Sequence, residues 1–115
     1  MTLRILIVED EMTIAFMLED MVSEMGHEVV EVAMRLPDAL SAARTAAIDL
    51  AILDINLDGR PSFEVADVLR ARGVPFFFST GYGSAGLDRD HADAQVLKKP
   101  FQQRDLAGAI DRALG

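Results

Sequence analysis

Apolar residues along the chain follow two different spacings. Continuous apolar runs occur at 4–8 (RILIV), 49–54 (DLAILD) and 74–79 (VPFFFS), as is typical of strands buried on both faces of a sheet. Weaker runs at 28–33 (EVVEVA) and 94–98 (AQVLK) predict two more strands. The pattern therefore predicts five strands.

Between these runs, apolar residues recur every three or four positions, which predicts amphipathic helices. The first helix is the best defined, and Gly26 ends it. Its apolar stripe consists of Ile14, Met17, Leu18, Met21, Val22 and Met25. Weaker stripes predict helices from Leu36 to Ala47, from Pro61 to the residue before Gly73, and from Leu106 to Ala113. Residues 83–93 contain a single leucine, so we expect a short, loosely docked or mobile fourth helix there.

Strands and helices alternate five times along the chain. This order indicates an α/β fold in which helices cover both faces of a doubly wound, five-stranded parallel sheet, joined by right-handed crossovers. A length of 115 residues suits one domain, spanning 1–115.

Composition narrows the possible functions. The absence of cysteine excludes disulfides, zinc–thiolate sites and thiol nucleophiles, and it fits a reducing compartment. A net charge of −8 opposes binding to nucleic-acid backbones. The apolar run near the N-terminus is too short for a signal peptide or a membrane span. We therefore expect a cytoplasmic protein that binds neither nucleic acid nor membrane.

Polar side chains stand at the carboxyl ends of four predicted strands, where ligands bind in open parallel sheets. These residues are Glu9 and Asp10 after the first strand, Asp54 at the end of the third, Ser79 and Thr80 at the end of the fourth, and Lys98 and Lys99 at the end of the fifth. We expect three carboxylates, a hydroxyl and an ammonium to meet at one edge of the sheet.

Three neighbouring carboxylates repel one another more than one lysine can offset. Mg²⁺ is the natural counter-ion, because it takes oxygen ligands, commonly one or two carboxylates, and keeps several waters. A carboxylate beside Mg²⁺ and a lysine can accept a phosphoryl group to form an aspartyl phosphate. Metal, lysine and hydroxyl would stabilise the charge of the transition state.

Each of these residues also has an ordinary structural interpretation. The acids at 9–11 could simply favour a helix N-terminus, Asp54 could hydrogen-bond the following turn, and Lys98 could be a solvated charge. The specific signal is that every member of the set stands at the carboxyl end of its strand, in the right order along the chain. His27 and His91 have no partner at a catalytic or ligand spacing, so we interpret both as solvated surface residues. The methionines of the first helix are interpreted as core residues.

The motifs at the strand ends resemble the receiver domain of bacterial two-component response regulators, over nearly the whole chain. ILIVEDE resembles the family's first strand and acidic pair, LDINLDG its phosphoacceptor segment, FSTGYG its switch-hydroxyl segment, and KKPF its lysine–proline pair. The resemblance implies a flavodoxin-like sheet with strand order 2-1-3-4-5.

The resemblance also implies roles for particular residues. Asp54 would be the phosphoacceptor, and Mg²⁺ would be bound by Glu9, Asp10, Asp54 and the backbone carbonyl of Asn56. The switch hydroxyl would be Thr80, followed by the small residue Gly81; the phosphate-binding lysine would be Lys99, followed by a cis peptide bond to Pro100.

One departure from the family concerns its rotating aromatic residue. Most receivers carry tyrosine or phenylalanine three residues before the lysine, where this chain has Val96. FSTGYG is similar to the Phe-Ala-Thr-Gly-hydrophobic-Tyr pattern of a receiver branch that lacks this aromatic. Members of that branch are often stand-alone or stress-signalling receivers served by kinases of the HWE type.

The function implied is a phosphorylation-dependent switch and not an enzyme, beyond promoting its own phosphorylation and dephosphorylation. A sensor histidine kinase or histidine phosphotransfer protein would donate the phosphoryl group, and a downstream protein would bind the switch. The protein itself is expected to be a monomer or a weak dimer. One alternative is a haloacid-dehalogenase-like phosphatase, although Asn56 stands where that class needs a second acid. Another is a receiver-like module that binds partners without phosphorylation. The chain ends directly after the last predicted helix, which favours a stand-alone receiver over a domain cut from a longer protein.

Overall fold

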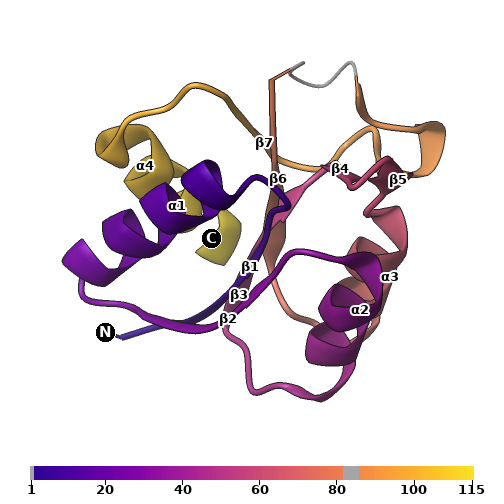
Figure 1. The fold of residues 1–115 in the computed structure, drawn as a ribbon, viewed down its shortest axis with the longest axis horizontal. Helices are drawn as coiled ribbons and strands as arrows, with labels where there is room; N and C mark the ends of the chain where they lie inside the picture. The colour runs from indigo at the N-terminus through magenta and orange to yellow at the C-terminus, as the bar shows by residue number, and fades with distance from the viewer. Residues whose placement is uncertain (1, 82–85) are drawn as a thin grey trace.

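Five parallel strands form the central sheet of the computed structural model, which describes residues 2–81 and 86–115 (Figure 1). The strands are β1 (Arg4–Val8), β2 (Glu28–Ala33), β3 (Leu50–Asp54), β6 (Phe76–Thr80) and β7 (Val96–Lys98). They lie side by side in the order β2-β1-β3-β6-β7. Counted along the chain, this is the predicted 2-1-3-4-5 order of a flavodoxin-like sheet, which is therefore confirmed.

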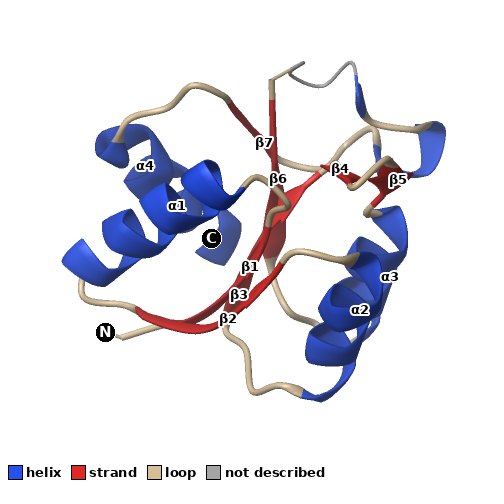
Figure 2. Ribbon diagram, viewed as in Figure 1, coloured by secondary structure: helices blue, strands red, loops and turns tan. Residues whose placement is uncertain are grey.

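Four helices cover the two faces of this sheet within the described residues. They are α1 (Met12–Glu24), α2 (Leu36–Thr45), α3 (Phe63–Ala71) and α4 (Gln103–Leu114). Helices α1 and α4 lie on one face, and α2 and α3 lie on the other (Figures 1 and 2). Both faces are dry, so the inner strands need apolar residues at every position, which explains their continuous apolar runs.

The two layers of helices enclose two hydrophobic clusters separated by the sheet. On the α1/α4 face, Leu18 and Ile110 pack against strand residues such as Ile7 and Phe77. On the α2/α3 face, Ala43, Leu69 and Phe78 belong to the second cluster. Successive strand residues alternate between the clusters, because side chains along a strand point to opposite faces.

The segment expected to form a fourth helix differs from the prediction. Its described part, 86–93, contains no α-helix but a three-residue 3₁₀ helix, Arg89–His91 (η2); residues 83–85 lie outside the described residues. Within the described residues the structure therefore has four α-helices where five helices were expected. The segment offers only Leu87 as a large aliphatic contact to the core, which is too little apolar surface to hold a full helix on the sheet.

A small hairpin follows β3 that the pattern did not predict. Strands β4 (Asn56–Leu57) and β5 (Arg60–Pro61) pair antiparallel across Asp58 and Gly59. Both turn residues have positive φ, 52° and 79°, as the favoured two-residue hairpin turn requires. The turn was expected at this place, but Pro61 was wrongly assigned to the next helix, which begins at Phe63.

Three surface and core assignments made from the sequence also change. His91 is buried, with only 3% of its surface exposed. His27 is half-buried, and its Nδ1 accepts a hydrogen bond of 3.1 Å from the backbone N–H of Leu3. Met17, assigned to the core, is instead at the surface of α1. The apolar stripe of α1 is therefore wider than the face of the helix that is buried.

No helix in the described part of the chain combines the length and apolar character needed to cross a bilayer.

Candidate functional site

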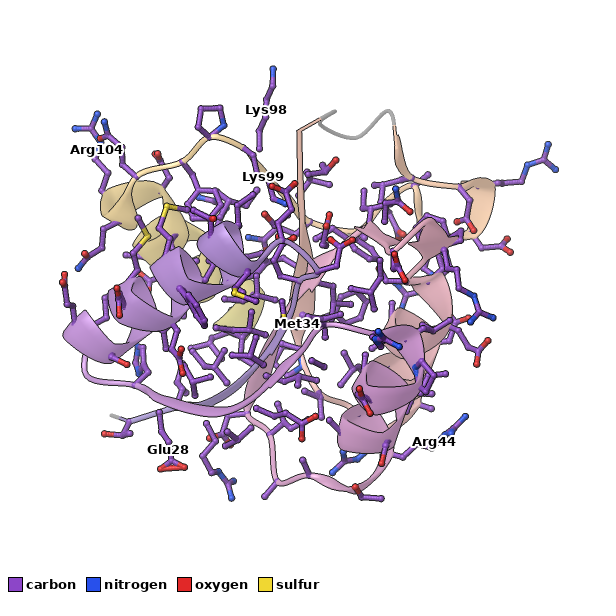
Figure 3. All side chains as sticks on the ribbon, in the orientation of Figure 1. Glu28, Met34, Arg44, Lys98, Lys99 and Arg104 are labelled. Carbon is purple, nitrogen blue, oxygen red and sulfur yellow. The ribbon has the colours of Figure 1, made fainter. Side chains whose placement is uncertain are left out.

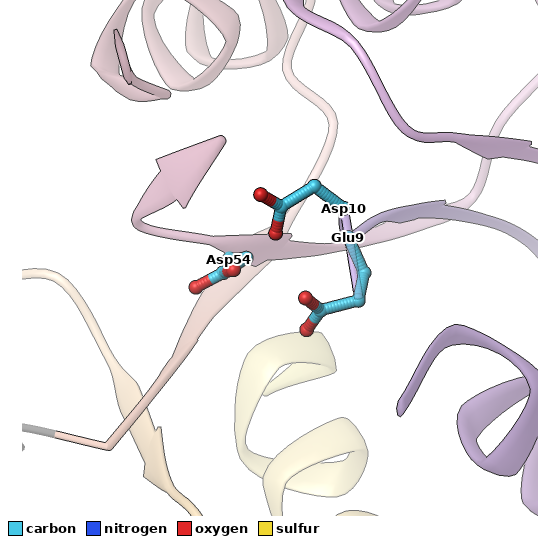
Figure 4. Close-up of side chains that lie close together, drawn as sticks. All are labelled: Glu9, Asp10 and Asp54. Atoms are coloured by element: carbon cyan, nitrogen blue, oxygen red, sulfur yellow. The ribbon is translucent and has the colours of Figure 1, made fainter. Parts of the chain in front are cut away.

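Three carboxylates meet at the carboxyl end of the sheet (Figure 4). Glu9 and Asp10 directly follow β1, and Asp54 is the last residue of β3. Because β1 and β3 are hydrogen-bonded neighbours running in the same direction, their ends bring these side chains together. One oxygen of each carboxylate lies within 4.8 Å of the other two. The sequence prediction of an acidic cluster from strands one and three is confirmed in its geometry.

Lys99 supplies the positive charge beside this cluster. Its Nζ donates a hydrogen bond of 2.7 Å to Oε1 of Glu9 and lies 3.7 Å from Oδ1 of Asp54. The peptide bond between Lys99 and Pro100 is cis, as the resemblance implied. Lys98 is exposed and extends outward from the molecule, whereas Lys99 lies closer to its centre (Figure 3). Only the second lysine of the pair therefore reaches the carboxylates.

The remaining predicted residues line an open pocket above the cluster. The pocket has a volume of about 300 Å³. Its lining consists of Asp10, Glu11, Asp54, Ile55, Asn56, Thr80, Gly81 and Lys99. Thr80 is the last residue of β6 and is buried at 3% exposure, with its carbonyl accepting a hydrogen bond of 2.8 Å from the N–H of Lys99. The lining thus brings together a residue with a hydroxyl, Thr80, a carboxylate, Asp54, and an ammonium, Lys99.

Burial, reinforced by neighbouring negative charge, dominates the electrostatics of the site. Burial, together with the neighbouring Glu9 and Asp10 carboxylates, raises the pKa of Asp54 to about 7, although Lys99 opposes this shift. An ionised Asp54 is thus held in an unfavourable environment at neutral pH. A bound cation would offset this repulsion.

The donor set fits a hard divalent cation. Three carboxylates within reach of one another, with no sulfur or imidazole donor in the cluster, are oxygen ligands of the kind that Mg²⁺ prefers. The pocket also leaves room for the waters that Mg²⁺ retains. The residues that would hold the ion are Glu9, Asp10, Asp54 and the carbonyl of Asn56.

Two supporting contacts were missed by the sequence prediction. The N–H of Asp58 donates a hydrogen bond of 2.8 Å to Oδ2 of Asp10, so the hairpin turn orients that carboxylate. The hydroxyl of Ser62, fully buried, donates a hydrogen bond of 2.5 Å to the backbone carbonyl of Asp54. The sequence signal for the first contact was the Asp58-Gly59 turn. Ser62 carried no signal beyond being a hydroxyl residue at a helix start.

Comparison with known proteins identifies a family and several relatives. The family model described as response regulator receiver domain matches residues 5–111. The phyllosphere-induced regulator PhyR of Methylorubrum extorquens is 36% identical over 99% of this chain, which corresponds to 44% of that protein. The solution structure of SdrG from Sphingomonas melonis Fr1 superposes with a TM-score of 0.89 and 40% identity, over 99% of this chain and 98% of that chain.

A second solved structure, the BeF3-activated conformation of SdrG from Pseudomonas melonis Fr1, matches with a TM-score of 0.83 and 40% identity. It covers 97% of this chain and 96% of that chain. The chain spans about half the length of the curated relatives it matches first.

Proposed function

The chain belongs to the response regulator receiver domain family, and on that premise we propose that it is a phosphorylation-dependent signalling switch with Asp54 as its phosphoacceptor. The observation that carries this proposal is the meeting of Glu9, Asp10 and Asp54 beside the ammonium of Lys99. The family acts in two-component signalling, so the phosphoryl donor would be a histidine kinase or a histidine phosphotransfer protein.

The proposed reaction transfers a phosphoryl group from a phosphohistidine to Asp54. A carboxylate oxygen of Asp54 attacks phosphorus in line, a P–O bond forms, and the P–N bond to the donor imidazole breaks. The imidazole leaves with the electron pair of that bond and takes up a proton. Mg²⁺, held by the acidic cluster and the Asn56 carbonyl, would neutralise charge on the transferred oxygens.

The residues around the pocket would act on the product of this transfer. Lys99 pairs with one phosphoryl oxygen, and its hydrogen bond to Glu9 supports this role because it holds the ammonium beside the acidic cluster. The Thr80 hydroxyl hydrogen-bonds another oxygen, and the loop at Gly81 moves with it. The similarity to SdrG, which adopts a BeF3-activated conformation, supports such a response, because BeF3⁻ resembles a phosphoryl group in shape and charge.

Incubation with a small phosphodonor such as acetyl phosphate tests the proposal directly. Intact mass measurement is expected to show one phosphoryl adduct that forms in the presence of Mg²⁺ and is lost when the ion is chelated. The physical reason is that the three carboxylates repel an incoming phosphoryl group unless a cation intervenes.

The same experiment separates the alternatives. Slow release of phosphate from many unrelated phosphoesters would favour a haloacid-dehalogenase-like phosphatase. No adduct under any condition, in a protein that still folds, would favour a module that binds partners without phosphorylation and would contradict the proposed switch.

We further propose that the protein donor docks on the start of α1, next to the pocket. Met12 and Phe16 are 57% and 55% exposed, unusually high values for large apolar side chains, and they share one helix face. Met17 lines an apolar groove of about 290 Å³ that continues to Lys99 and Pro100. A donor bound over this surface would stand beside the phosphoacceptor pocket.

Substitution Phe16→Ala is expected to slow phosphotransfer from a phosphorylated histidine phosphotransfer protein about tenfold, equivalent to about 1.4 kcal/mol of lost contact. Phosphorylation by acetyl phosphate should be unchanged, because Phe16 does not line the pocket. Leu114→Ala is the matched control, since it removes another exposed apolar side chain at the far end of α4. Equal slowing with both donors would contradict a docking role for Phe16.

A further inference from the structure

A buried histidine holds the segment that follows the pocket. His91, in the 3₁₀ helix η2, has each ring nitrogen against a carboxylate: Nδ1 lies 2.5 Å from Oδ1 of Asp88, and Nε2 lies 2.8 Å from Oδ1 of Asp67. Asp88 precedes η2 in the chain, and Asp67 is on α3. The histidine therefore joins the segment 86–94, which we name the clasped segment, to α3.

This geometry specifies the charge of the imidazole. A neutral ring has one N–H donor and one bare nitrogen, whereas an ionised carboxylate only accepts hydrogen bonds. Both contacts are hydrogen bonds only if His91 is protonated. Burial lowers the pKa of His91, but the hydrogen bonds and charges of Asp88 and Asp67 together raise it by more than burial lowers it. The pKa of His91 therefore lies above its ordinary value.

Among the described residues, two titrating groups contribute to this shift, and both are carboxylates. Asp88 faces it from its own segment and Asp67 faces it from α3. Two aromatic rings also contact it: Phe63 of α3 stacks on the imidazole at 4.6 Å and 14°, and Phe78 of β6 meets it edge-on at 6.4 Å. Stacking on Phe63 also favours the cation.

These contacts connect the clasped segment to β6, which carries the pocket residue Thr80, and to the start of α3. Phe78 stands two residues before Thr80 on β6. Phe63 directly follows Ser62, whose hydroxyl binds the backbone carbonyl of Asp54. A displacement of β6 or of the start of α3 would therefore change the contacts of the imidazole. The chain has Val96 where most receivers have a rotating aromatic residue, so this contact offers another connection between the pocket and the surface.

We propose that protonated His91 is the residue that positions the clasped segment on α3 and β6, and that loss of its proton releases this segment. Release would alter the surface that the clasped segment, which follows the switch residue Thr80 in the chain, presents to a downstream partner. This regulatory consequence rests on the proposed function. The positioning role itself does not.

The direction of the pH dependence follows from linkage. A histidine whose pKa is raised in the folded protein contributes its full stabilisation below the unfolded value of about 6.5 and loses it as the pH rises through the folded value. Hydrogen-exchange protection of the clasped segment should therefore fall over that range, after correction for the intrinsic pH dependence of exchange.

Nuclear magnetic resonance on the ¹⁵N-labelled chain tests this. Ring nitrogen shifts report the midpoint of the His91 titration, and amide exchange reports protection of the clasped segment. In the wild type we expect a midpoint above that of the free side chain and roughly tenfold lower protection on its alkaline side. Asp67→Asn should lower the midpoint by about half to one pH unit, because it removes one partly exposed opposite charge.

Two further variants complete the design. Asp90→Asn is the matched control, since Asp90 lies in the same 3₁₀ helix but is exposed and makes no ion pair with the described residues; it should behave as wild type. His91→Gln should give low protection with no titration, with retained dispersion of the remaining amide signals showing that the fold persists.

Either of two results would overturn the inference: a His91 midpoint that Asp67→Asn does not move, or protection that stays constant while the ring titrates. Neither readout uses phosphorylation, so failure of the positioning role of His91 and failure of the proposed switch are distinguishable. A third arm adds acetyl phosphate and Mg²⁺ to a chain shown to be phosphorylated. An unchanged His91 midpoint there would overturn the coupling to the switch and leave the positioning role intact.

Discussion

Replacing Asp54 with asparagine is expected to abolish formation of the phosphoryl adduct. Asp54 is the one carboxylate of the cluster at the end of β3, and it lines the pocket together with Thr80 and Lys99. An amide oxygen is a far weaker nucleophile than a carboxylate and carries no charge toward the metal, so the loss should exceed a hundredfold in rate. Intact mass after incubation with acetyl phosphate and Mg²⁺ measures the effect.

Asp58→Asn is the matched control for this prediction. Asp58 lies four residues later, in the hairpin turn, and asparagine tolerates its positive φ of 52° as aspartate does. Its backbone N–H, which orients Asp10, is retained in the variant. The control should therefore be phosphorylated at close to the wild-type level. An adduct that persists in Asp54→Asn would place the phosphoacceptor elsewhere and refute the assignment.

The second large effect is on folding stability. Substitution Lys99→Met removes the ammonium that hydrogen-bonds Glu9, which is only 1% exposed, and leaves that carboxylate buried without its cation. Breaking a buried ion pair by removing one partner costs about 3–5 kcal/mol, and the partial exposure of the lysine reduces this to about 2–4 kcal/mol at pH 8 without Mg²⁺. Urea unfolding midpoints measure the loss.

The loss should depend on pH in a defined direction. Asp54 has a pKa raised to about 7, so its ionisation destabilises the folded state as the pH rises from its unfolded value of 3.8 toward 7. Lys99 opposes that shift, and its removal makes the ionised cluster still less favourable. The deficit of Lys99→Met should therefore be largest at pH 8 and smaller at pH 5.5, and Mg²⁺ should recover part of it.

Lys98→Met is the control, because Lys98 is exposed and stands next to Lys99 in the chain. It should change the free energy of unfolding by less than about 0.5 kcal/mol. If both substitutions cost the same, or if the cost of Lys99→Met did not vary with pH, the ammonium of Lys99 would have no special role in holding the cluster.

Much of the site followed from the sequence because a parallel sheet gathers the ends of its strands at one edge. Once the apolar runs defined β1, β3 and β6, the positions of Glu9, Asp10, Asp54 and Thr80 at that edge required no further information. The choice of Lys99 over Lys98 came from the family resemblance alone. In the structure it is visible as a hydrogen bond to a residue ninety positions away.

Other features could not be predicted, because they depend on which side chains face each other after packing. Nothing in the spacing of His91 and Asp67, 24 residues apart, indicated that the end of one segment would dock on α3. The exposure of Met17 depended on how much of α1 the sheet could cover. The helix expected between β6 and β7 is absent from the described part of that segment, 86–93, because its few apolar residues could not compensate for the entropy of ordering it.

The sequence by itself determined the order of strands and helices, the strand edge at which the acids gather and the residue types available for phosphoryl chemistry, since periodicity and chain order control all three. Only the tertiary structure decided the distances within the carboxylate cluster, the raised pKa of Asp54 and the charged state that His91 must adopt. Those properties arise from burial and from contacts between residues distant in the chain, which no local pattern encodes.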